Sequence, residues 1–265
     1  MPEGDTLRRT AAGLAPHLVG RVVTGARARA GGAQVQRVVG ATVEAVESAG
    51  KNLLIRFDNG LELRTHLRMN GSWHRYRPGE RWRRPESRAR LVLEVPGAVA
   101  VCFDAPVIEL FETRAAAIHP TLSRLGPDLL DPAWGSDHAA EARRRFRDPA
   151  RAAATIAEGL LDQRALAGIG NIWRNETLFA ERVNPWTLVR ELDDATLDRL
   201  VATARRLLRD SVERPPGRAP IRVYRRSGRP CRRCGTIIRS APLATEIPRT
   251  TYWCPSCQPD TAADG

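Results

Sequence analysis

The spacing of apolar residues in the first 113 residues predicts one helix followed by a set of strands. Apolar residues at intervals of four, three and four give one face to a helix over residues 5–18, which Asp5 or Thr6 can cap. The β-favouring segments that follow predict strands over residues 21–28, 35–47, 52–58, 61–67, 90–95, 99–103 and 107–111. An Asp-Asn-Gly sequence at 58–60 is a strong hairpin signal. This region therefore predicts a β-sandwich or barrel behind an N-terminal helix.

Alanine- and leucine-rich helical periodicity begins after residue 113. Helices are expected over residues 114–125, 136–147, 150–162, 172–182 and 193–212, and Pro-Pro-Gly at 215–217 ends the last of them. A short segment bounded by cysteines follows. We expect an α+β chain with an N-terminal β-sandwich domain at 1–113, a helical domain at 114–220 and a small metal module at 221–260.

Basic residues are concentrated in two segments of the chain. The formal net charge is +12, and residues 205–239 hold 12 arginines against two acidic residues. Residues 64–90 hold nine arginines against two acidic residues, so the rest of the chain is mildly acidic. An arginine-rich genome would explain the choice of arginine over lysine, but it would not explain the clustering. The pattern favours binding to a polyanion such as nucleic acid.

Membrane insertion and secretion are not expected from this sequence. No apolar run approaches the length of a membrane span, and the first ten residues lack the apolar core of a signal peptide. Cys102 lies in an apolar stretch and is expected to be a small buried residue. We therefore expect a cytoplasmic protein.

The other four cysteines form two Cys-x-x-Cys pairs separated by 19 residues, Cys231 with Cys234 and Cys254 with Cys257. This spacing predicts one tetrahedral Zn²⁺ with four thiolate ligands, and the intervening loop can form two short strands. Four protein ligands leave no open position for water, so the zinc is expected to be structural. The alternative, a redox dithiol, requires a thioredoxin-like context that is absent. No redox or nucleotide cofactor is expected.

The N-terminal Met-Pro-Glu sequence is compatible with covalent chemistry. Removal of the initiator methionine would make Pro2 a terminal secondary amine, which is partly neutral near pH 8 and can attack an aldehyde carbon. Glu3 could move protons beside it. The alternative is an ordinary start of a helix, because many proteins begin with Met-Pro.

Four motifs together resemble the formamidopyrimidine-DNA glycosylase and endonuclease VIII family, over essentially the whole chain. They are MPEGDT at 1–6, GKNLLIRF at 50–57, LAGIGNIWRNE at 166–176 and PRTTYWCPSCQ at 248–258. The opening resembles the actinobacterial endonuclease VIII subgroup. The family implies a β-sandwich, a helix–two-turn–helix domain and a zinc finger. It also implies a bifunctional glycosylase and β,δ-lyase that flips a damaged nucleotide out of the duplex.

The resemblance implies four catalytic residues. Pro2 matches the Schiff-base nucleophile and Glu3 the general acid/base. Lys51 matches the lysine assigned to phosphate binding and β-elimination, and Arg249 the zinc-finger arginine assigned to δ-elimination. Lys51 is also the one lysine among 42 basic residues, and it falls on this motif. Arginine cannot replace lysine where a compact charge must give up a proton, so this coincidence supports a role for the ammonium group.

The resemblance also implies five DNA-contacting residues. Asn171 follows a glycine-rich turn that can present N–H groups to a phosphate. Arg124 matches a DNA-binding arginine of the endonuclease VIII branch. Arg68, Met69 and Asn70 align with the loop that fills the space left by the flipped nucleotide, with Met69 as a wedge. The alternative for Met69 is a core methionine at a strand end.

The chain departs from the common Pro-Glu-Gly-Pro-Glu opening, because it has Asp5 and Thr6 after Gly4. The triplet at 68–70 also differs from the usual one. Oxidised pyrimidines are the expected substrates, because residues 211–226 are shorter than the loop that closes over oxidised guanine in the formamidopyrimidine branch. The alternatives are an oxidised-purine glycosylase and a non-enzymatic protein that binds damaged DNA. We expect a monomer that acts on double-stranded DNA, is associated with the nucleoid and does not bind membranes.

Overall fold

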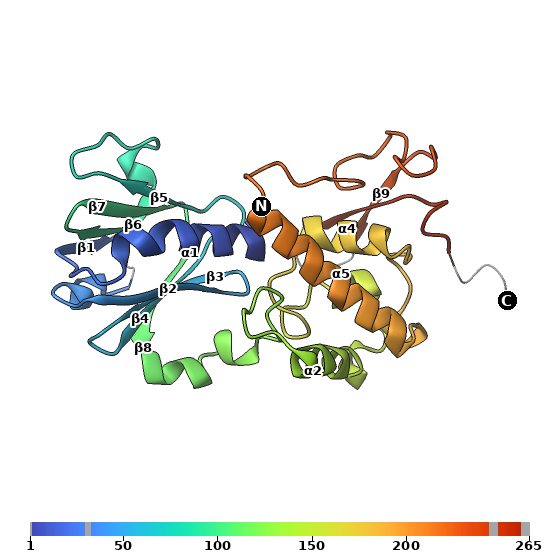
Figure 1. The fold of residues 1–265 in the computed structure, drawn as a ribbon, viewed down its shortest axis with the longest axis horizontal. Helices are drawn as coiled ribbons and strands as arrows, with labels where there is room; N and C mark the ends of the chain where they lie inside the picture. The colour runs from blue at the N-terminus through green and yellow to red at the C-terminus, as the bar shows by residue number, and fades with distance from the viewer. Residues whose placement is uncertain (1, 30–32, 244–248, 261–265) are drawn as a thin grey trace. The chain divides into compact units, whose positions relative to one another are not determined.

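The computed structural model describes residues 2–29, 33–243 and 249–260, and its contacts divide the chain into two units, residues 1–124 and 125–265. The first unit contains helix α1 (Gly4–Leu18) and two four-stranded sheets (Figure 1). One sheet has the order β1 (Gly25–Ala28), β6 (Ala89–Val95), β7 (Ala98–Phe103) and β5 (Ser72–Tyr76). The other has the order β2 (Val43–Ala49), β3 (Asn52–Phe57), β4 (Leu61–His66) and β8 (Val107–Glu112). All neighbouring strands in both sheets are antiparallel.

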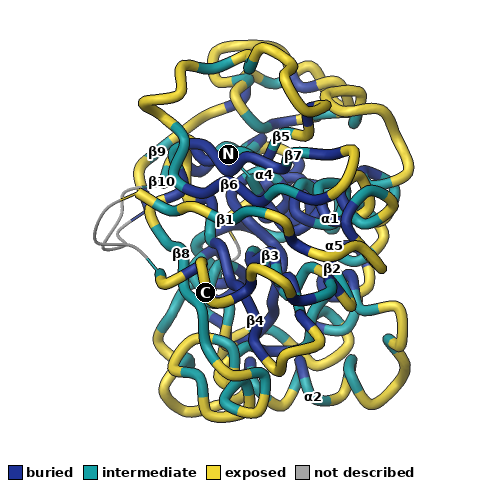
Figure 2. The backbone as a smooth tube through the Cα atoms, turned by 90° about the vertical axis from the view of Figure 1, so that its left-hand side faces the viewer, coloured by how far each residue is buried: buried dark blue, intermediate teal, exposed yellow. Residues whose placement is uncertain are grey.

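One apolar core joins α1 to both sheets, which confirms the predicted sandwich. Leu7 of α1, Leu53 of β3 and Leu91 of β6 are all fully buried in it. Figure 2 shows buried backbone along β3 and β4, with the exposed segments in the connecting loops. Cys102 is fully buried in the same core, as expected.

Several predicted elements of this unit differ from the observed ones. Residues 21–24 are not in a strand, residues 35–38 form a 3₁₀ helix (Val35–Val38), and the backbone then turns at Gly40, whose φ is +87°, before β2 begins. Strand β5 was not expected, since its Ser-Trp-His-Arg-Tyr sequence lacks a clear alternation. Helix α1 starts after Glu3, not at Asp5 or Thr6, because the Glu3 carbonyl already accepts hydrogen bonds from two helical N–H groups. The predicted hairpin at 58–60 is confirmed, with Gly60 at φ +77°.

The second unit contains four α-helices and one two-stranded sheet in its described residues. They are α2 (Ser136–Phe146), α3 (Ile156–Gly159), α4 (Asn171–Ala180), α5 (Asp194–Glu213), β9 (Arg239–Leu243) and β10 (Arg249–Trp253). Leu178 of α4 and Leu208 of α5 are fully buried in the core of this unit. Strands β9 and β10 lie between the two cysteine pairs, as predicted.

Two of the predicted helices are wrong in extent. Residues 150–162 contain only a 3₁₀ turn and the short α3, because Thr155 has an extended backbone and caps α3 through Glu158. Residues 113–124 hold two 3₁₀ helices, Thr113–Ile118 and Leu122–Arg124, separated by Pro120. The contacts group these residues with the first unit. The three-part division at residues 113 and 220 stays a prediction.

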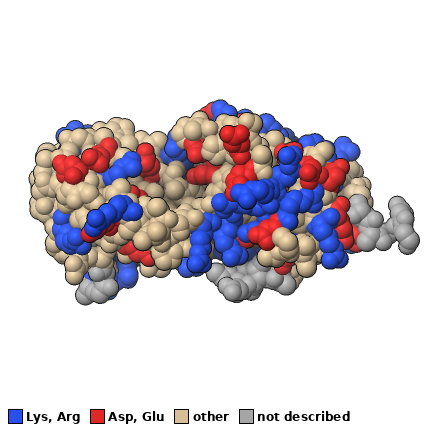
Figure 3. All heavy atoms as spheres, turned by 90° about the horizontal axis from the view of Figure 1, so that it is seen from below, with Lys and Arg blue, Asp and Glu red and all other residues tan. Residues whose placement is uncertain are grey.

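Many arginines of the second unit are neutralised by ion pairs. On the face shown in Figure 3, basic side chains lie among acidic ones. Arg143 of α2 pairs with Asp198 of α5 at 2.6 Å, and Arg147 pairs with Asp194 at 2.6 Å. Pairs of this kind hold α2 against α5 and contribute modestly to stability. None of the helices in the described ranges is both long and apolar enough to span a membrane.

Candidate active site and metal centre

The N-terminal end of α1 and the β2–β3 turn lie at the same end of the sandwich (Figure 1). Gly20, just after α1, donates to the carbonyl of Val43 at the start of β2, and α1 packs along β2. The helix and the strand are each about 20 Å long, so the start of α1 reaches the end of β2. Pro2 is half-buried there, and the neighbouring Glu3 is fully buried.

Lys51 lies in the two-residue turn between β2 and β3. Gly50 occupies the first turn position with φ +57°, a conformation that glycine adopts at no steric cost. The Asn52 side chain closes the turn by donating to the Ala49 carbonyl at 2.9 Å. Its Oδ1 in turn accepts a hydrogen bond from Arg64 Nε at 2.9 Å. These contacts fix the backbone that carries Lys51.

His66 adds a neutral imidazole to this end of the sandwich, and sequence reasoning assigned it no role. It is the register partner of Asn52 across β3 and β4. Burial is the main reason that the pKa of His66 falls to about 4. The positive charges of Arg64, Arg68 and Lys51 act in the same direction. His66 therefore stays uncharged well below neutral pH, mainly because it is buried and in part because of the neighbouring positive charges.

The lowered pKa of His66 predicts a loss of stability in mild acid. As pH falls from about 6.5 towards 4, the unfolded chain takes up a proton that folded His66 refuses, so the free energy of unfolding decreases. The decrease levels off below about pH 4, where both states are protonated. An NMR titration of the His66 ring should give a midpoint near pH 4. The variant His66→Gln should lack this part of the pH dependence, and a midpoint near 6.5 in the folded protein would contradict the prediction.

The turn at residues 67–71 follows β4 at this same end. The Gly71 N–H donates to the Leu67 carbonyl at 2.9 Å, and a Cβ on Gly71 would lie 2.6 Å from that oxygen. Arg68 adopts φ +49°, which is unusual for a residue with a side chain and costs on the order of 1 kcal/mol. Met69 is 53% exposed, so the alternative of a core methionine is wrong. Its role as a wedge stays a prediction.

Asn171 and Arg249 are brought together in the second unit. Asn171 is the first residue of α4 and donates from Nδ2 to the carbonyl of Thr250 at 3.2 Å, next to Arg249 in β10. Arg174 and Asn175 of α4 also bind β10, through Thr251 Oγ1 at 2.9 Å and Tyr252 N–H at 2.7 Å. Helix α4 therefore fixes the strand that carries Arg249. Arg124 is exposed at the last residue of the first unit, away from any other predicted site residue in sequence.

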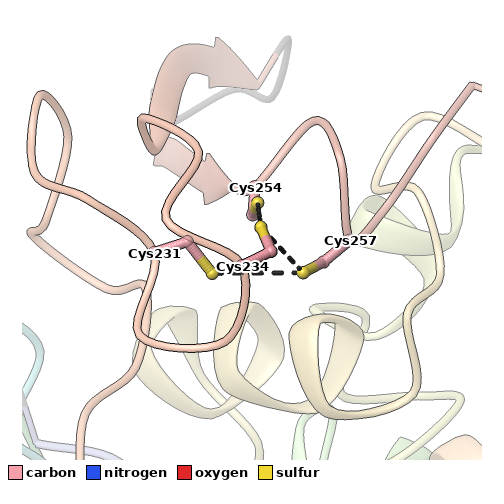
Figure 4. A group of neighbouring side chains, drawn as sticks. All are labelled: Cys231, Cys234, Cys254 and Cys257. Carbon is pink, nitrogen blue, oxygen red and sulfur yellow. Dashed lines mark hydrogen bonds between the residues drawn. The ribbon is translucent and has the colours of Figure 1, made fainter.

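The four cysteines predicted to bind zinc form one cluster. Figure 4 shows their side chains pointing toward one another, with all four Sγ atoms within 4.8 Å. The Sγ–Sγ distances are 3.5 Å for Cys234–Cys254, 4.0 Å for Cys231–Cys257 and 3.5 Å for Cys234–Cys257. A tetrahedral zinc with bonds of about 2.3 Å requires about 3.8 Å between sulfurs. A disulfide requires about 2.05 Å, so the cluster fits one zinc and contains no disulfide.

Glu176 is a second residue that sequence reasoning missed. Its carboxylate accepts hydrogen bonds from the backbone N–H groups of Arg222, Val223 and Tyr224 at 2.8–3.0 Å. Burial raises the pKa of Glu176, although these three N–H groups favour its charged form. The contact fixes the segment between α5 and the cysteine cluster onto α4. An acidic residue on the buried face of a helix was the signal for it in the sequence.

Apart from Arg124 and the four cysteines, the predicted residues form two groups, one in each unit. Pro2, Glu3, Lys51 and the 68–70 turn gather at one end of the sandwich, while Asn171 and Arg249 meet between α4 and β10. A nucleophile candidate beside a buried carboxylate, a cationic turn and a four-cysteine cluster that could hold a metal ion are features typical of an enzyme that acts on an anionic substrate.

Family models and relatives identify that class. The formamidopyrimidine-DNA glycosylase N-terminal domain matches residues 1–106, and the formamidopyrimidine-DNA glycosylase H2TH domain matches residues 125–220. The chain is 40% identical to a probable endonuclease 8 2 of Streptomyces coelicolor, over 97% of this chain and 94% of that protein. It is 36% identical to the DNA-(apurinic or apyrimidinic site) lyase Nei2 of Mycolicibacterium smegmatis, over 97% and 99% of the two chains.

A solved structure agrees with these matches. The MutM (Fpg) protein of Thermus thermophilus has a TM-score of 0.82 and 28% identity, over 97% of this chain and 98% of that one. The chain belongs to the formamidopyrimidine-DNA glycosylase and endonuclease VIII family of base excision repair, whose members are DNA glycosylases and lyases. The expectation from the four sequence motifs is confirmed.

Proposed function

We propose that this protein excises oxidised bases, preferentially pyrimidines, from duplex DNA and then cleaves the strand by β,δ-elimination. The proposal is carried by the position of three residues. Half-buried Pro2 and fully buried Glu3 lie at the end of the sandwich that also bears the Lys51 turn. A secondary amine, a carboxyl group and a cation at one end are the groups that this chemistry needs.

The Pro2 amine attacks C1′ of the damaged nucleotide and forms a C–N bond as the C–N bond to the base breaks. Glu3 donates a proton to the ring oxygen, and the sugar opens to an iminium ion. The iminium accepts the electron pair released when a proton leaves C2′, and the 3′ phosphate departs in β-elimination. Lys51 holds a phosphate beside the lesion during these steps and takes part in proton movement during base release. Arg249 assists departure of the 5′ phosphate in δ-elimination.

Double-stranded DNA is the partner that the remaining residues are suited to bind. Asn171 and Arg249 offer an amide and a guanidinium next to the N-terminus of α4, and Arg124 adds an exposed charge. Met69, on its strained turn, is proposed to fill the space left by the flipped nucleotide, flanked by Arg68 and Asn70. Related structures support DNA as partner, since Lactococcus lactis Fpg binds DNA that contains an abasic site, at a TM-score of 0.83.

The preference for pyrimidines rests on the short segment after α5. Helix α5 ends at Glu213, and Glu176 already holds the backbone at Arg222, so only residues 214–221 lie between. A connection of this length leaves little chain to close over a large purine. The resemblance of the sequence motifs to the endonuclease VIII branch implies the same preference.

Base release from a panel of duplexes tests this function. We expect faster release from DNA that contains thymine glycol or 5-hydroxyuracil than from DNA that contains 8-oxoguanine. Faster release of the purine would support the oxidised-purine alternative instead. Binding with no base release and no cleavage of abasic DNA would support the non-enzymatic alternative.

The cysteine cluster is proposed to hold one structural zinc ion. We expect elemental analysis to find one zinc per chain, because all four thiolates are close enough to share one ion. The variant Cys254→Ser should lose the metal, unfold residues 226–258 and weaken DNA binding, while the sandwich stays folded. Cys102→Ser, outside the cluster, should keep its zinc. A metal-free wild-type protein with an ordered cysteine module would contradict the assignment.

The proposed activity needs no second subunit and no membrane. We propose that the protein acts as a monomer in the cytoplasm, associated with the nucleoid. Sedimentation of the protein with and without duplex DNA would test the oligomeric state.

A further inference from the structure

Residues 77–88 form a crossover that returns the chain to the end of the sandwich that carries the 67–71 turn. Strands β5 and β6 lie on either side of β7 and are both antiparallel to it, so they run in the same direction. Phe103 of β7 pairs with Ser72 at the start of β5 and with Ala89 at the start of β6. The crossover therefore begins at the far end of β5 and comes back to the candidate active-site end.

Aromatic contacts hold this crossover against the sheet. Trp82 stacks on Tyr76 with ring centroids 6.0 Å apart, and it meets the Phe103 ring edge-on at 5.8 Å. The Tyr76 hydroxyl accepts the Arg83 N–H at 3.0 Å and contacts His74 Nδ1 at 2.9 Å. These residues form a small apolar cluster of their own, separate from the sandwich core. The backbone of the crossover is thus fixed before any ligand binds.

The end of the crossover is attached to the turn that bears Met69. Arg84 Nη1 donates to the Asn70 carbonyl at 3.4 Å and pairs with Asp104 at 2.6 Å. Arg88 binds the same carboxylate through Nε at 2.8 Å. Asp104 therefore offsets one of these two positive charges, and Arg84 ties the crossover to the 68–70 turn.

Three other arginines of the crossover, and one at the end of β5, form no ion pair with the acidic residues that the structure describes. They are exposed, and within the described ranges no acidic side chain lies at ion-pair distance from any of them: Arg75, Arg77, Arg81 and Arg83. The two nearby acids have other contacts, since Glu80 accepts the backbone N–H of Arg77 and Glu86 lies 4.0 Å from Arg27. Arginines of α2, by contrast, pair with acids of α5. The crossover is thus a strongly positive surface, which arginine-rich composition alone does not explain.

We propose that the crossover binds the phosphate backbone of the duplex that flanks the lesion, through Arg77, Arg81 and Arg83. This proposal rests on the proposed function, because it takes the 68–70 turn as the point where DNA is engaged. Duplex DNA carries one charge per about 1.7 Å of its axis, so a helix engaged at that turn presents further phosphates to the neighbouring crossover. Guanidinium forks bind phosphate through paired hydrogen bonds, and a fixed backbone reduces the entropic cost of binding.

The test compares two triple variants that each remove three positive charges. The crossover variant is Arg77→Gln/Arg81→Gln/Arg83→Gln. The matched control is Arg21→Gln/Arg37→Gln/Arg114→Gln, at the end of the sandwich opposite the 67–71 turn, where Arg21 binds the Pro96 carbonyl and the other two arginines border the 58–60 turn. Binding to a duplex with a central abasic-site analogue is measured by fluorescence anisotropy over a range of salt concentrations. Two further duplexes are also used. In each of them only a few base pairs remain on one side of the abasic-site analogue, and the shortened side differs between the two.

For the crossover variant on the full duplex, we expect the slope of log affinity against log salt to be smaller by about 2–3, at about 0.9 per lost phosphate contact. On the shortened duplex that lacks the flank bound by the crossover, the crossover variant and the wild type should have equal affinity. The control triple should keep the wild-type slope on the full duplex. An unchanged slope for the crossover variant, or an equal loss in the control, would overturn the proposal.

Borohydride trapping on abasic DNA separates this proposal from the proposed function. At saturating DNA, the crossover variant should trap at the wild-type rate, because its substitutions leave Pro2 and Glu3 in place. Wild-type protein that binds DNA but is never trapped would refute the proposed function, and the salt slopes would still report on the crossover. Each single substitution should lower the slope by about 1, so the proposal remains testable if the triple variant is unstable.

Discussion

The variant Lys51→Arg is expected to lower the rate of base excision by roughly 10²–10⁴-fold, the range for loss of an acid/base group. The substitution keeps the positive charge but replaces a compact ammonium group with a wider, permanently protonated fork. The turn that carries Lys51 is fixed by Asn52 and Arg64, so the larger group cannot be accommodated by a shift of the backbone. Cleavage of a preformed abasic site should decrease less, because Pro2 is still present. The measurement is the ratio of the rates on lesion and abasic duplexes.

A conservative exchange on β3, the strand that follows Lys51, serves as the control. Arg56→Lys in β3, whose side chain pairs with Glu47 at 3.2 Å, should leave both rates unchanged. Equal losses on both substrates for Lys51→Arg would indicate that Lys51 only positions phosphate. No loss on either substrate would show that the single lysine has no catalytic role.

The variant Pro2→Gly, or an uncleaved extension before Pro2, is expected to lower covalent trapping by a factor on the order of 10³ or more, as for the loss of a nucleophile. DNA affinity should remain nearly unchanged, because phosphate contacts supply most of it. An extension of the same length at the C-terminus is the matched control and should trap normally. Full trapping by a protein with a blocked N-terminus would exclude Pro2 as the nucleophile.

Local signals in the sequence account for part of the fold and the metal site. The two Cys-x-x-Cys pairs, the Asp-Asn-Gly hairpin and the apolar face of α1 each depend on residues close in sequence. The Pro2–Glu3 pair and Lys51 were found because they fall within motifs of the family. For such features the chemistry of a few neighbouring residues determines the local structure.

Features that depend on distant contacts could not be predicted in this way. The place of Glu176 on the buried face of a helix is a local signal, but its partners lie 46 to 48 positions later and the sequence does not identify them. His66 appears as an ordinary polar residue until burial and the charge of Lys51 lower its pKa. No element was predicted for strand β5 or the 77–88 crossover, because the packing of Trp82 on Tyr76 that orders them cannot be seen in the local sequence. Tertiary packing determines all three.

The central claim is that the amine of Pro2 forms the covalent bond to the damaged nucleotide. The most direct test is to reduce the wild-type protein with borohydride in the presence of abasic-site duplex and to locate the adduct by mass spectrometry after proteolysis. The account predicts one DNA adduct on the N-terminal peptide, at a Pro2 from which the initiator methionine has been removed. An adduct on the peptide that carries Lys51, or no adduct with fully active protein, would contradict it.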